Sequence, residues 1–269
     1  MTTDEKYSLL RERIKACGSL AVAFSGGVDS CFLLKTAQDV LGGRVLALTV
    51  CSDFVPARER KEAAEFCRRY GIRQELLYVD VLADPEVKDN PPDRCYHCKR
   101  ALFSLMKERA AALGFPLLAE GSNLDDLDDY RPGMRAVGEL GVLSPLRDAS
   151  LRKNEIRELS KRLGLASWDK PSFACLASRF VYGETITAEK LRRVEAAEDC
   201  LRSLGFRQYR VRSHGELARI ELLPEELPRL ADAPLREEVH DALRKLGFRY
   251  VSLDLAGFRS GSMNESLDK

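Results

Sequence analysis

Residues 20–30 read Leu-Ala-Val-Ala-Phe-Ser-Gly-Gly-Val-Asp-Ser, and this stretch decides the fold class of the chain. The apolar run over residues 20–24 predicts a short buried strand, and apolar residues at helical spacing over 29–41 predict the helix that follows. Two glycines between strand and helix leave successive backbone N–H groups exposed at the helix N-terminus, where the helix dipole favours an anion. The stretch therefore predicts a phosphate-binding loop.

The glycine spacing distinguishes this loop from two commoner phosphate loops. A Walker loop needs Gly-x-x-x-x-Gly-Lys-Ser/Thr and a Rossmann loop needs Gly-x-Gly-x-x-Gly, and residues 25–30 fit neither pattern. They instead match Ser-Gly-Gly-x-Asp-Ser, so the stretch resembles the loop of the PP-loop ATP pyrophosphatases. The structural alternative is an ordinary glycine turn, which six specified positions between a strand and a helix disfavour.

Length and composition limit the class of protein. The chain has 269 residues, of which 45% are hydrophobic and 32% charged, values typical of a globular protein with a sizeable core. A net charge of +1 gives no general attraction to nucleic acid. The sequence shows neither a signal-peptide pattern nor an apolar run of about 18 residues, so we expect a cytoplasmic protein with no membrane partner.

The order of predicted elements indicates an α/β fold with a doubly wound parallel sheet. Strands are predicted over residues 20–24, 44–50, 73–79, 116–120 and 142–146, and helices over 5–17, 29–41, 56–70, 99–113 and 153–163. Residues 84–93 contain three prolines and are predicted to form a loop. Ligands bind at the carboxyl ends of the strands in such folds, so we expect Val50, Ser52 and Gly121 to line the nucleotide site.

A smaller α+β domain is predicted after residue 182. Helices are expected over 187–204 and 234–246, and strands over 208–212, 216–222 and 250–254. The heptapeptide at 201–207, Leu-Arg-Ser-Leu-Gly-Phe-Arg, recurs at 243–249 as Leu-Arg-Lys-Leu-Gly-Phe-Arg, which indicates an internal repeat. We therefore predict a PP-loop domain over 1–182 and a domain for substrate binding or oligomerisation over 183–269.

Three of the eight cysteines lie outside apolar patterns: Cys95, Cys98 and Cys175. A single Cys-x-x-Cys is compatible with a zinc site, a redox pair or an iron–sulfur cluster. A second Cys-x-x-Cys, which would complete a structural zinc site, is absent from the sequence. Three thiolates could hold three irons of a [4Fe–4S] cluster and leave the fourth iron open for hydrosulfide. Spacing alone leaves a cluster, zinc and uncoordinated thiols as alternatives.

The chain as a whole resembles the LarE family of ATP-dependent sulfur transferases. The stretches that carry the resemblance are Ser25–Ser30, Asp129–Gly133, Ser178–Phe180, Arg210–Arg212, Ala218–Leu222, Gly247–Tyr250 and Gly257–Gly261. The resemblance implies that the enzyme adenylates a carboxylate of pyridinium-3,5-biscarboxylic acid mononucleotide and then converts it to a thiocarboxylate. The order is chemically reasonable, because a carboxylate resists nucleophiles whereas an acyl-adenylate can expel AMP.

The resemblance also implies the roles of individual residues. The triphosphate of ATP and its Mg²⁺ would be held by Ser25, Gly26, Gly27, Asp29 and Ser30, with Asp29 and Ser30 in catalytic roles. The substrate and its phosphate would be bound by Ser178, Arg179, Arg210 and Arg212, with Glu198 binding metal or substrate. The structural alternative for Arg210 and Arg212 is an exposed strand face, because alternate residues share one side of a strand. The aspartates over 125–129 form either a solvated loop or part of the Mg²⁺ site.

For the sulfur source, the resemblance points to the branch of the family in which three cysteines hold a [4Fe–4S] cluster with extra sulfide. Cys95, Cys98 and Cys175 would be the ligands, with Cys175 as a catalytic residue. In the other branch a cysteine gives up its own sulfur, and that position corresponds to Ala174. The implied partners are a small-molecule nucleotide, a sulfide donor and further copies of the chain in a homo-oligomer.

Two other functions fit parts of the sequence. A PP-loop tRNA thiolase can also pair a Cys-x-x-Cys with a third cysteine, but it needs a surface for polyanionic RNA, which the near-neutral charge argues against. A nucleotide or metal carrier without catalytic activity is the second alternative, and the presence of Asp29 and Ser30 argues against it.

Overall fold

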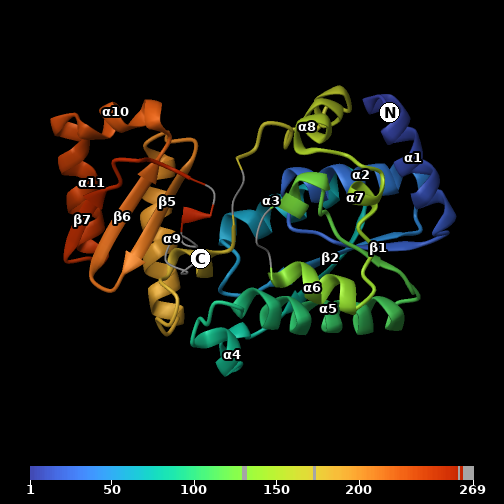
Figure 1. Ribbon diagram of the computed structural model, residues 1–269, viewed down its shortest axis with the longest axis horizontal. Helices are drawn as coiled ribbons and strands as arrows, with labels where there is room; N and C mark the ends of the chain where they lie inside the picture. Colours follow the sequence, from blue (N-terminus) through green and yellow to red (C-terminus); the bar gives the residue numbers. More distant parts are fainter. Residues whose placement is uncertain (129–131, 172–173, 260, 263–269) are drawn as a thin grey trace. The chain divides into compact units, whose positions relative to one another are not determined.

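The computed structural model describes residues 1–128, 132–171, 174–259, 261 and 262 (Figure 1). The chain forms two compact units, Met1–Asp80 with Asp93–Ser172, and Val81–Pro92 with Phe173–Lys269. This division differs from the single boundary expected near residue 182. Backbone hydrogen bonds explain why residues 81–92 join the second unit: the N–H of Gly183 donates to the carbonyl of Asn90 (2.8 Å), and that of Ile186 donates to the carbonyl of Lys88 (2.8 Å).

The first unit is built on a parallel sheet with the strand order β3-β2-β1-β4. Its described strands are β1 (Leu20–Ala23), β2 (Val45–Cys51), β3 (Arg73–Tyr78) and β4 (Leu118–Ala119). β1 lies in the interior of the sheet, because it pairs with β2 on one side and with β4 on the other. The predicted parallel α/β fold is therefore confirmed.

Helices cover both faces of this sheet (Figure 1). They are α1 (Thr3–Ala16), α2 (Val28–Leu41), α3 (Ala57–Arg69), α5 (Arg94–Ala112), α6 (Pro132–Glu139), α7 (Pro145–Asp148) and α8 (Lys153–Arg162). Successive residues of a strand point to opposite faces. Leu20 and Val22 accordingly join the core under α1, α2 and α8, whereas Ala21 joins the core on the side of α5 and α6. The double burial explains the uninterrupted apolar run of β1.

Three predicted segments differ from the structure. Residues 84–93, expected as a loop, contain the short helix α4 (Pro85–Lys88), which Asp84 caps by accepting from the N–H of Glu86 at 2.9 Å. α5 begins at Arg94 rather than after residue 98, so the Cys-x-x-Cys lies at the start of the helix. Residues 142–146, expected as a strand, form an isolated bridge at Leu143, because Pro145 begins α7.

The second unit contains a small mixed sheet with the order β5-β6-β7. Its elements are η1 (Val81–Ala83), α4, η3 (Leu176–Arg179), α9 (Ala188–Ser203), β5 (Tyr209–His214), β6 (Leu217–Leu222), η4 (Pro224–Glu226), α10 (Leu227–Ala231), α11 (Ala233–Lys245) and β7 (Tyr250–Leu253). β5 and β6 are antiparallel, whereas β6 and β7 are parallel. The expected small α+β unit is confirmed.

The repeated heptapeptide forms the same helix ending twice, after α9 and after α11. Gly205 (φ 85°) and Gly247 (φ 98°) adopt the left-handed conformation that glycine allows. In each copy the glycine N–H bonds to the carbonyl three residues earlier, at 2.9 and 3.0 Å, and the phenylalanine N–H bonds five residues back, at 3.2 Å in both. These pairs of bonds form a Schellman motif, so the repeat is a helix-capping signal that buries one phenylalanine per copy.

Candidate active site

The predicted phosphate loop connects β1 to the N-terminus of α2. Gly26 has φ 73°, and a Cβ there would lie 3.4 Å from the Cβ of Ala63 in α3. Gly27 caps α2 with extended backbone (φ −77°, ψ 167°) and without a side chain. The hydroxyls of Ser25 and Ser30 lie 3.1 Å apart across the loop, and that of Ser30 also donates to the carbonyl of Gly27 at 3.1 Å. The loop therefore combines a helix N-terminus with two hydroxyl groups, as an anion site requires.

Asp29, in the first turn of α2, contacts two other elements. The ammonium group of Lys153, the first residue of α8, donates to its Oδ2, and Nδ2 of Asn123 donates to its Oδ1 at 3.5 Å. Asp125 in turn accepts from the backbone N–H of Lys153 at 2.8 Å. This bond, together with Arg152, outweighs burial and lowers the pKa of Asp125. Asp125 thus anchors α8, while the side chain of Asp128 and all of Asp129 lie outside the described residues.

Lys170 is a second lysine at the loop. Its ammonium group donates to the carbonyl of Gly26 at 3.1 Å and to Glu62 of α3 at 2.6 Å. The sequence did not identify Lys153 or Lys170 as site residues, because one looks like an ordinary helix start and the other lies in the irregular stretch around residues 168–180. Both place a positive charge beside the loop, as binding of a triphosphate requires.

The other predicted nucleotide residues lie at the same edge of the sheet. Val50 and Ser52 flank the last residue of β2, the strand that pairs with β1. Gly121 follows β4, on the other side of β1, and a Cβ there would lie 3.1 Å from the backbone nitrogen of Ser30. The structure therefore brings all three to the carboxyl ends of strands beside the phosphate loop, and Gly121 packs directly against it.

Cys95 and Cys98 share one face of α5, because residues three apart are neighbours on a helix surface. Both are half-buried, and a guanidinium nitrogen of Arg94 lies 3.6 Å from the Sγ of Cys95. His97, which stands between them in sequence, contacts Asp93 instead, with Nε2 3.1 Å from Oδ2.

Cys175, the third predicted ligand, is exposed and belongs to the second unit. Over the described parts of the chain, no three Cys, His, Asp or Glu side chains are grouped as metal ligands. The predicted cluster ligands are thus divided between the two units.

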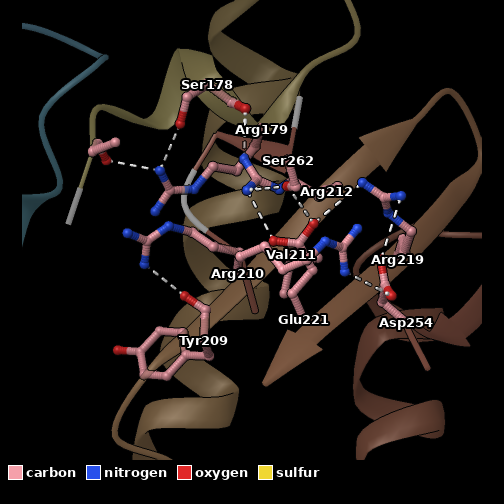
Figure 2. A network of polar contacts seen from close by, with 12 residues as sticks. Ser178, Arg179, Tyr209, Arg210, Val211, Arg212, Arg219, Glu221, Asp254 and Ser262 are labelled. Atoms are coloured by element: carbon pink, nitrogen blue, oxygen red, sulfur yellow. Dashed lines mark hydrogen bonds and ion pairs between the residues drawn. The ribbon is translucent and has the colours of Figure 1, made fainter. Parts of the chain in front are cut away.

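The predicted substrate residues gather within the second unit (Figure 2). Arg179, which is completely buried, forms a two-pronged ion pair with Glu198 of α9, with Nε–Oε1 and Nη2–Oε2 distances of 2.8 and 3.0 Å. Arg212 of β5 donates to the backbone carbonyl of Ser178 at 2.8 Å and to Glu221 of β6 at 2.8 Å. Four of the five residues predicted from the family resemblance are linked in this way, although they come from η3, α9 and β5.

Arg210, the fifth residue, lies one position before Val211 on the same strand. It donates to the carbonyl of Tyr209 at 2.7 Å, and its guanidinium group lies 5.1 Å from the ring centre of Phe258. Among the described charged residues of this unit, the buried ones comprise three arginines and two glutamates: Arg179, Arg210, Arg212, Glu198 and Glu221. The buried group therefore carries an excess of positive charge.

The pKa values of Arg210 and Glu198 are both lower than usual, as expected where positive charge is in excess. Burial, followed by the charge of Arg179, lowers the pKa of Arg210 to about 9. Burial also acts to raise the pKa of Glu198, but the positive charge and hydrogen bonds of Arg179 outweigh it, so the pKa lies below its usual value. A bound anion would compensate the charge on Arg210, which makes this unit a candidate for a second anion site in addition to the phosphate loop.

Comparison with known proteins identifies the family. No family model matches the chain. It is 43% identical over 266 residues to an uncharacterized protein of Synechocystis, with 99% of each chain covered. It is 40% identical over 270 residues to pyridinium-3,5-bisthiocarboxylic acid mononucleotide synthase of Lactiplantibacillus plantarum, a match that covers 100% of this chain and 97% of the relative. The chain belongs to the LarE family.

More distant relatives support the assignment of the phosphate loop. The LarE-family chain is 28% identical over 212 residues to a subunit of the glutamine-hydrolysing GMP synthase of Pyrococcus furiosus, covering 72% of this chain and 66% of the relative. Such GMP synthase subunits are PP-loop proteins. This member of the LarE family is therefore a PP-loop enzyme that uses ATP.

Proposed function

We propose that this enzyme adenylates a carboxylate of pyridinium-3,5-biscarboxylic acid mononucleotide and converts it to a thiocarboxylate. The name of the Lactiplantibacillus plantarum relative supports this substrate class. The observation that carries the proposal is the loop at Ser25–Ser30, with a helix N-terminus, two hydroxyls and the ammonium groups of Lys153 and Lys170 around one anion site.

In the first step, the loop residues hold and orient the triphosphate of ATP. The N–H groups at the start of α2 and the hydroxyls of Ser25 and Ser30 would donate to phosphate oxygens, while Lys153 and Lys170 balance the negative charge. The carboxylate of Asp29 would help to hold Mg²⁺, a cation that prefers oxygen ligands and would supply positive charge beside the phosphates. A substrate carboxylate oxygen then attacks the α-phosphorus, and pyrophosphate leaves.

The phosphate of the substrate is assigned to the arginines of the second unit. Arg210 and Arg212 lie on β5, and Arg212 donates to the backbone carbonyl of Ser178 at 2.8 Å. Nε of Arg212 is buried and has no hydrogen-bond acceptor among the described residues, so it can still donate to an anion. Guanidinium groups bind phosphate through paired N–H groups, which suits this cluster. We therefore place the substrate phosphate at Ser178, Arg210 and Arg212.

The three thiols outside the core are assigned to sulfur delivery. From the family resemblance, we propose that Cys95, Cys98 and Cys175 would hold an iron–sulfur cluster, for which thiolates are the usual ligands. When bound, such a cluster would supply sulfide from an outside donor. The sulfur forms a bond to the acyl carbon, and AMP leaves with the oxygen.

The proposal extends to the cellular compartment and the oligomeric state of the enzyme. A reducing cytoplasm would keep these cysteines as thiols. Across the described residues, no helix has the length and apolar character needed to cross a membrane. We propose a small-molecule nucleotide as the substrate partner and, from the family resemblance, a closed homo-oligomer.

A paired substitution on α2 tests the proposed function. Purified enzyme is incubated anaerobically with Mg²⁺–ATP, the biscarboxylic acid mononucleotide and sulfide, while AMP, pyrophosphate and thiocarboxylate are measured. Asp29→Asn should slow formation of all three by roughly 100-fold, because the variant loses the carboxylate that would hold Mg²⁺ beside the phosphates. Asp39→Asn is the matched control, because Asp39 lies on the same helix but pairs with Lys35. Equal activity of the two variants, or no AMP from the wild type, would refute the proposal.

Intact mass after turnover separates the two sulfur sources. Delivery by a cluster leaves the mass of the chain unchanged. If Cys175 were the sulfur source, the chain would lose the mass of one hydrogen sulfide, with the change mapped to residue 175.

A further inference from the structure

We propose that Arg179 and Glu198 are positioning residues that hold the segment bearing Cys175 at a fixed distance from the arginines of β5. The pair would thereby align the substrate with the sulfur centre, instead of binding the substrate or a metal. This inference rests on the proposed function, because it takes Cys175 as part of sulfur delivery and Arg210 and Arg212 as the phosphate site.

Arg179 forms hydrogen bonds to the backbone on both sides of the Cys175 side chain. Nη1 of Arg179 donates to the carbonyls of Ala174 (2.7 Å) and Cys175 (3.0 Å). The same nitrogen lies 2.9 Å from the hydroxyl of Ser178 (Figure 2). One guanidinium nitrogen therefore contacts three oxygens of a single short segment. The backbone of Cys175 is fixed while its side chain stays exposed.

The other end of the pair is fixed to β5. The carboxylate of Glu198 accepts both prongs of the Arg179 guanidinium, and its Oε1 also accepts from the backbone N–H of Val211 at 3.1 Å. Val211 stands between Arg210 and Arg212, so this bond holds the strand at the centre of the phosphate site. A second link runs in parallel, from Nη1 of Arg212 to the carbonyl of Ser178 at 2.8 Å.

The ion pair of Arg179 and Glu198, with its bonds to the Cys175 segment and to β5, is called the bridge below. Both side chains are completely buried, which indicates that they serve this contact and not a ligand. The side chains of Arg179 and Glu198 are each 0% exposed. A bidentate ion pair compensates the desolvation of both charges. A lysine at residue 179 could not form it, because an ammonium group lacks the planar pair of N–H donors. Because neither group reaches solvent and both already bond to protein atoms, their effect on the substrate passes through Cys175 and β5.

The alignment matters because the acyl-adenylate has two fates. Attack by sulfide on the acyl carbon gives thiocarboxylate and AMP, whereas attack by water gives the original carboxylate and AMP. Both reactions release one AMP, so the ratio of AMP to thiocarboxylate reports how well the sulfur centre is placed. Loosening the bridge should favour water over sulfide, so more AMP should be released for each thiocarboxylate formed.

Two graded variants test the bridge. Glu198→Gln keeps an oxygen that can accept from the N–H of Val211, but it loses the negative charge and one of the two acceptors for Arg179. Arg179→Lys keeps the positive charge but loses the planar guanidinium group that forms two parallel hydrogen bonds. We expect both to raise the ratio of AMP to thiocarboxylate by roughly tenfold or more, since a displacement of about 1 Å can cost up to two orders of magnitude in rate. The ratio compares two fates of one intermediate, so it reports the position of the sulfur centre even where substrate binding or the overall rate of AMP formation also changes. In the enzyme without iron, alkylation of Cys175 by iodoacetamide should become several-fold faster.

The control is Leu191→Ala, which removes a buried side chain from α9 about two turns before Glu198. It should lower the melting temperature but leave both the product ratio and the alkylation rate of Cys175 at wild-type values. A fall in AMP and thiocarboxylate in equal proportion, with unchanged alkylation, would overturn the inference. So would unfolding of both bridge variants, because the pair would then serve folding alone. Absence of AMP from the wild type would instead refute the proposed function.

Discussion

Gly121 packs against the phosphate loop so closely that a Cβ at this position would lie 3.1 Å from the backbone nitrogen of Ser30. The loop must therefore shift by a few tenths of an ångström to admit even alanine. Because the N–H groups of this turn are the proposed ligands of ATP, Gly121→Ala should weaken ATP binding about tenfold, which corresponds to roughly 1.4 kcal/mol. Isothermal titration calorimetry with ATP measures the change.

Gly138→Ala in α6 of the same unit is the control for that variant. A Cβ at residue 138 meets no atom within 4 Å, and alanine favours helix more than glycine. Its ATP affinity should equal that of the wild type. The same loss of affinity in both variants would mean that close packing at Gly121 has no special role.

Lys153 is predicted to be required for ATP binding because its ammonium group bonds to Asp29. Lys153→Met would remove one positive charge from beside the phosphates, so the affinity for ATP should fall by about one to two orders of magnitude at low salt. Exchange of labelled pyrophosphate into ATP, measured at several ATP concentrations, reports the effect. Lys35→Met is the control, since Lys35 pairs with Asp39 towards the other end of α2 and should not affect exchange.

The pair of Lys6 and Glu155 should make the stability of the enzyme depend on pH. Burial acts to raise the pKa of Glu155, but hydrogen bonds from Lys6 and from the backbone of Arg152 outweigh it, so the pKa is lowered. A carboxylate with a lowered pKa stabilises the fold above its unfolded pKa of about 4.3, and this contribution is lost as the pH falls through the folded value.

Glu155→Gln should therefore reduce the free energy of unfolding by about 1 kcal/mol at pH 7, the size typical of a capping bond with an ion pair. At about pH 3 the wild type and the variant should differ less, because protonation removes the same charge. Urea titrations at both pH values measure the difference. A difference that stayed constant with pH would contradict this assignment.

The elements that the sequence predicts well are those with local signals. The apolar run of β1, the two glycines and the helical spacing of α2 follow one another directly, and the predicted boundaries agree with the structure to within about one residue. The repeat at 201–207 and 243–249 is likewise recognisable, because Leu-Gly-Phe at a helix end is a local capping signal. Local patterns also place the residues of the phosphate loop.

The parts that the sequence does not predict depend on contacts between distant residues. Nothing local shows that Glu198 faces Arg179, nineteen positions earlier in the sequence, or that Lys153 reaches Asp29 from another helix. The helical conformation at Cys95 is hidden because three prolines close by suggest a longer loop. The roles of the buried arginines come from the family resemblance, since alternating residues on a strand could equally indicate an exposed face.

The last prediction concerns the thiols. After anaerobic reconstitution with iron and sulfide, the wild type should bind iron and acid-labile sulfide, whereas Cys95→Ser, Cys98→Ser and Cys175→Ala should each lose most of both. Cys67→Ala is the control and should keep its iron, because Cys67 is buried in the apolar core of the first unit, away from the thiols assigned to the cluster. If all four variants bound as much iron as the wild type, the cluster would be excluded. If Cys175→Ala kept its iron while Cys95→Ser and Cys98→Ser lost theirs, the third ligand would have to be sought elsewhere in the chain, and Cys175 would remain as a candidate sulfur source.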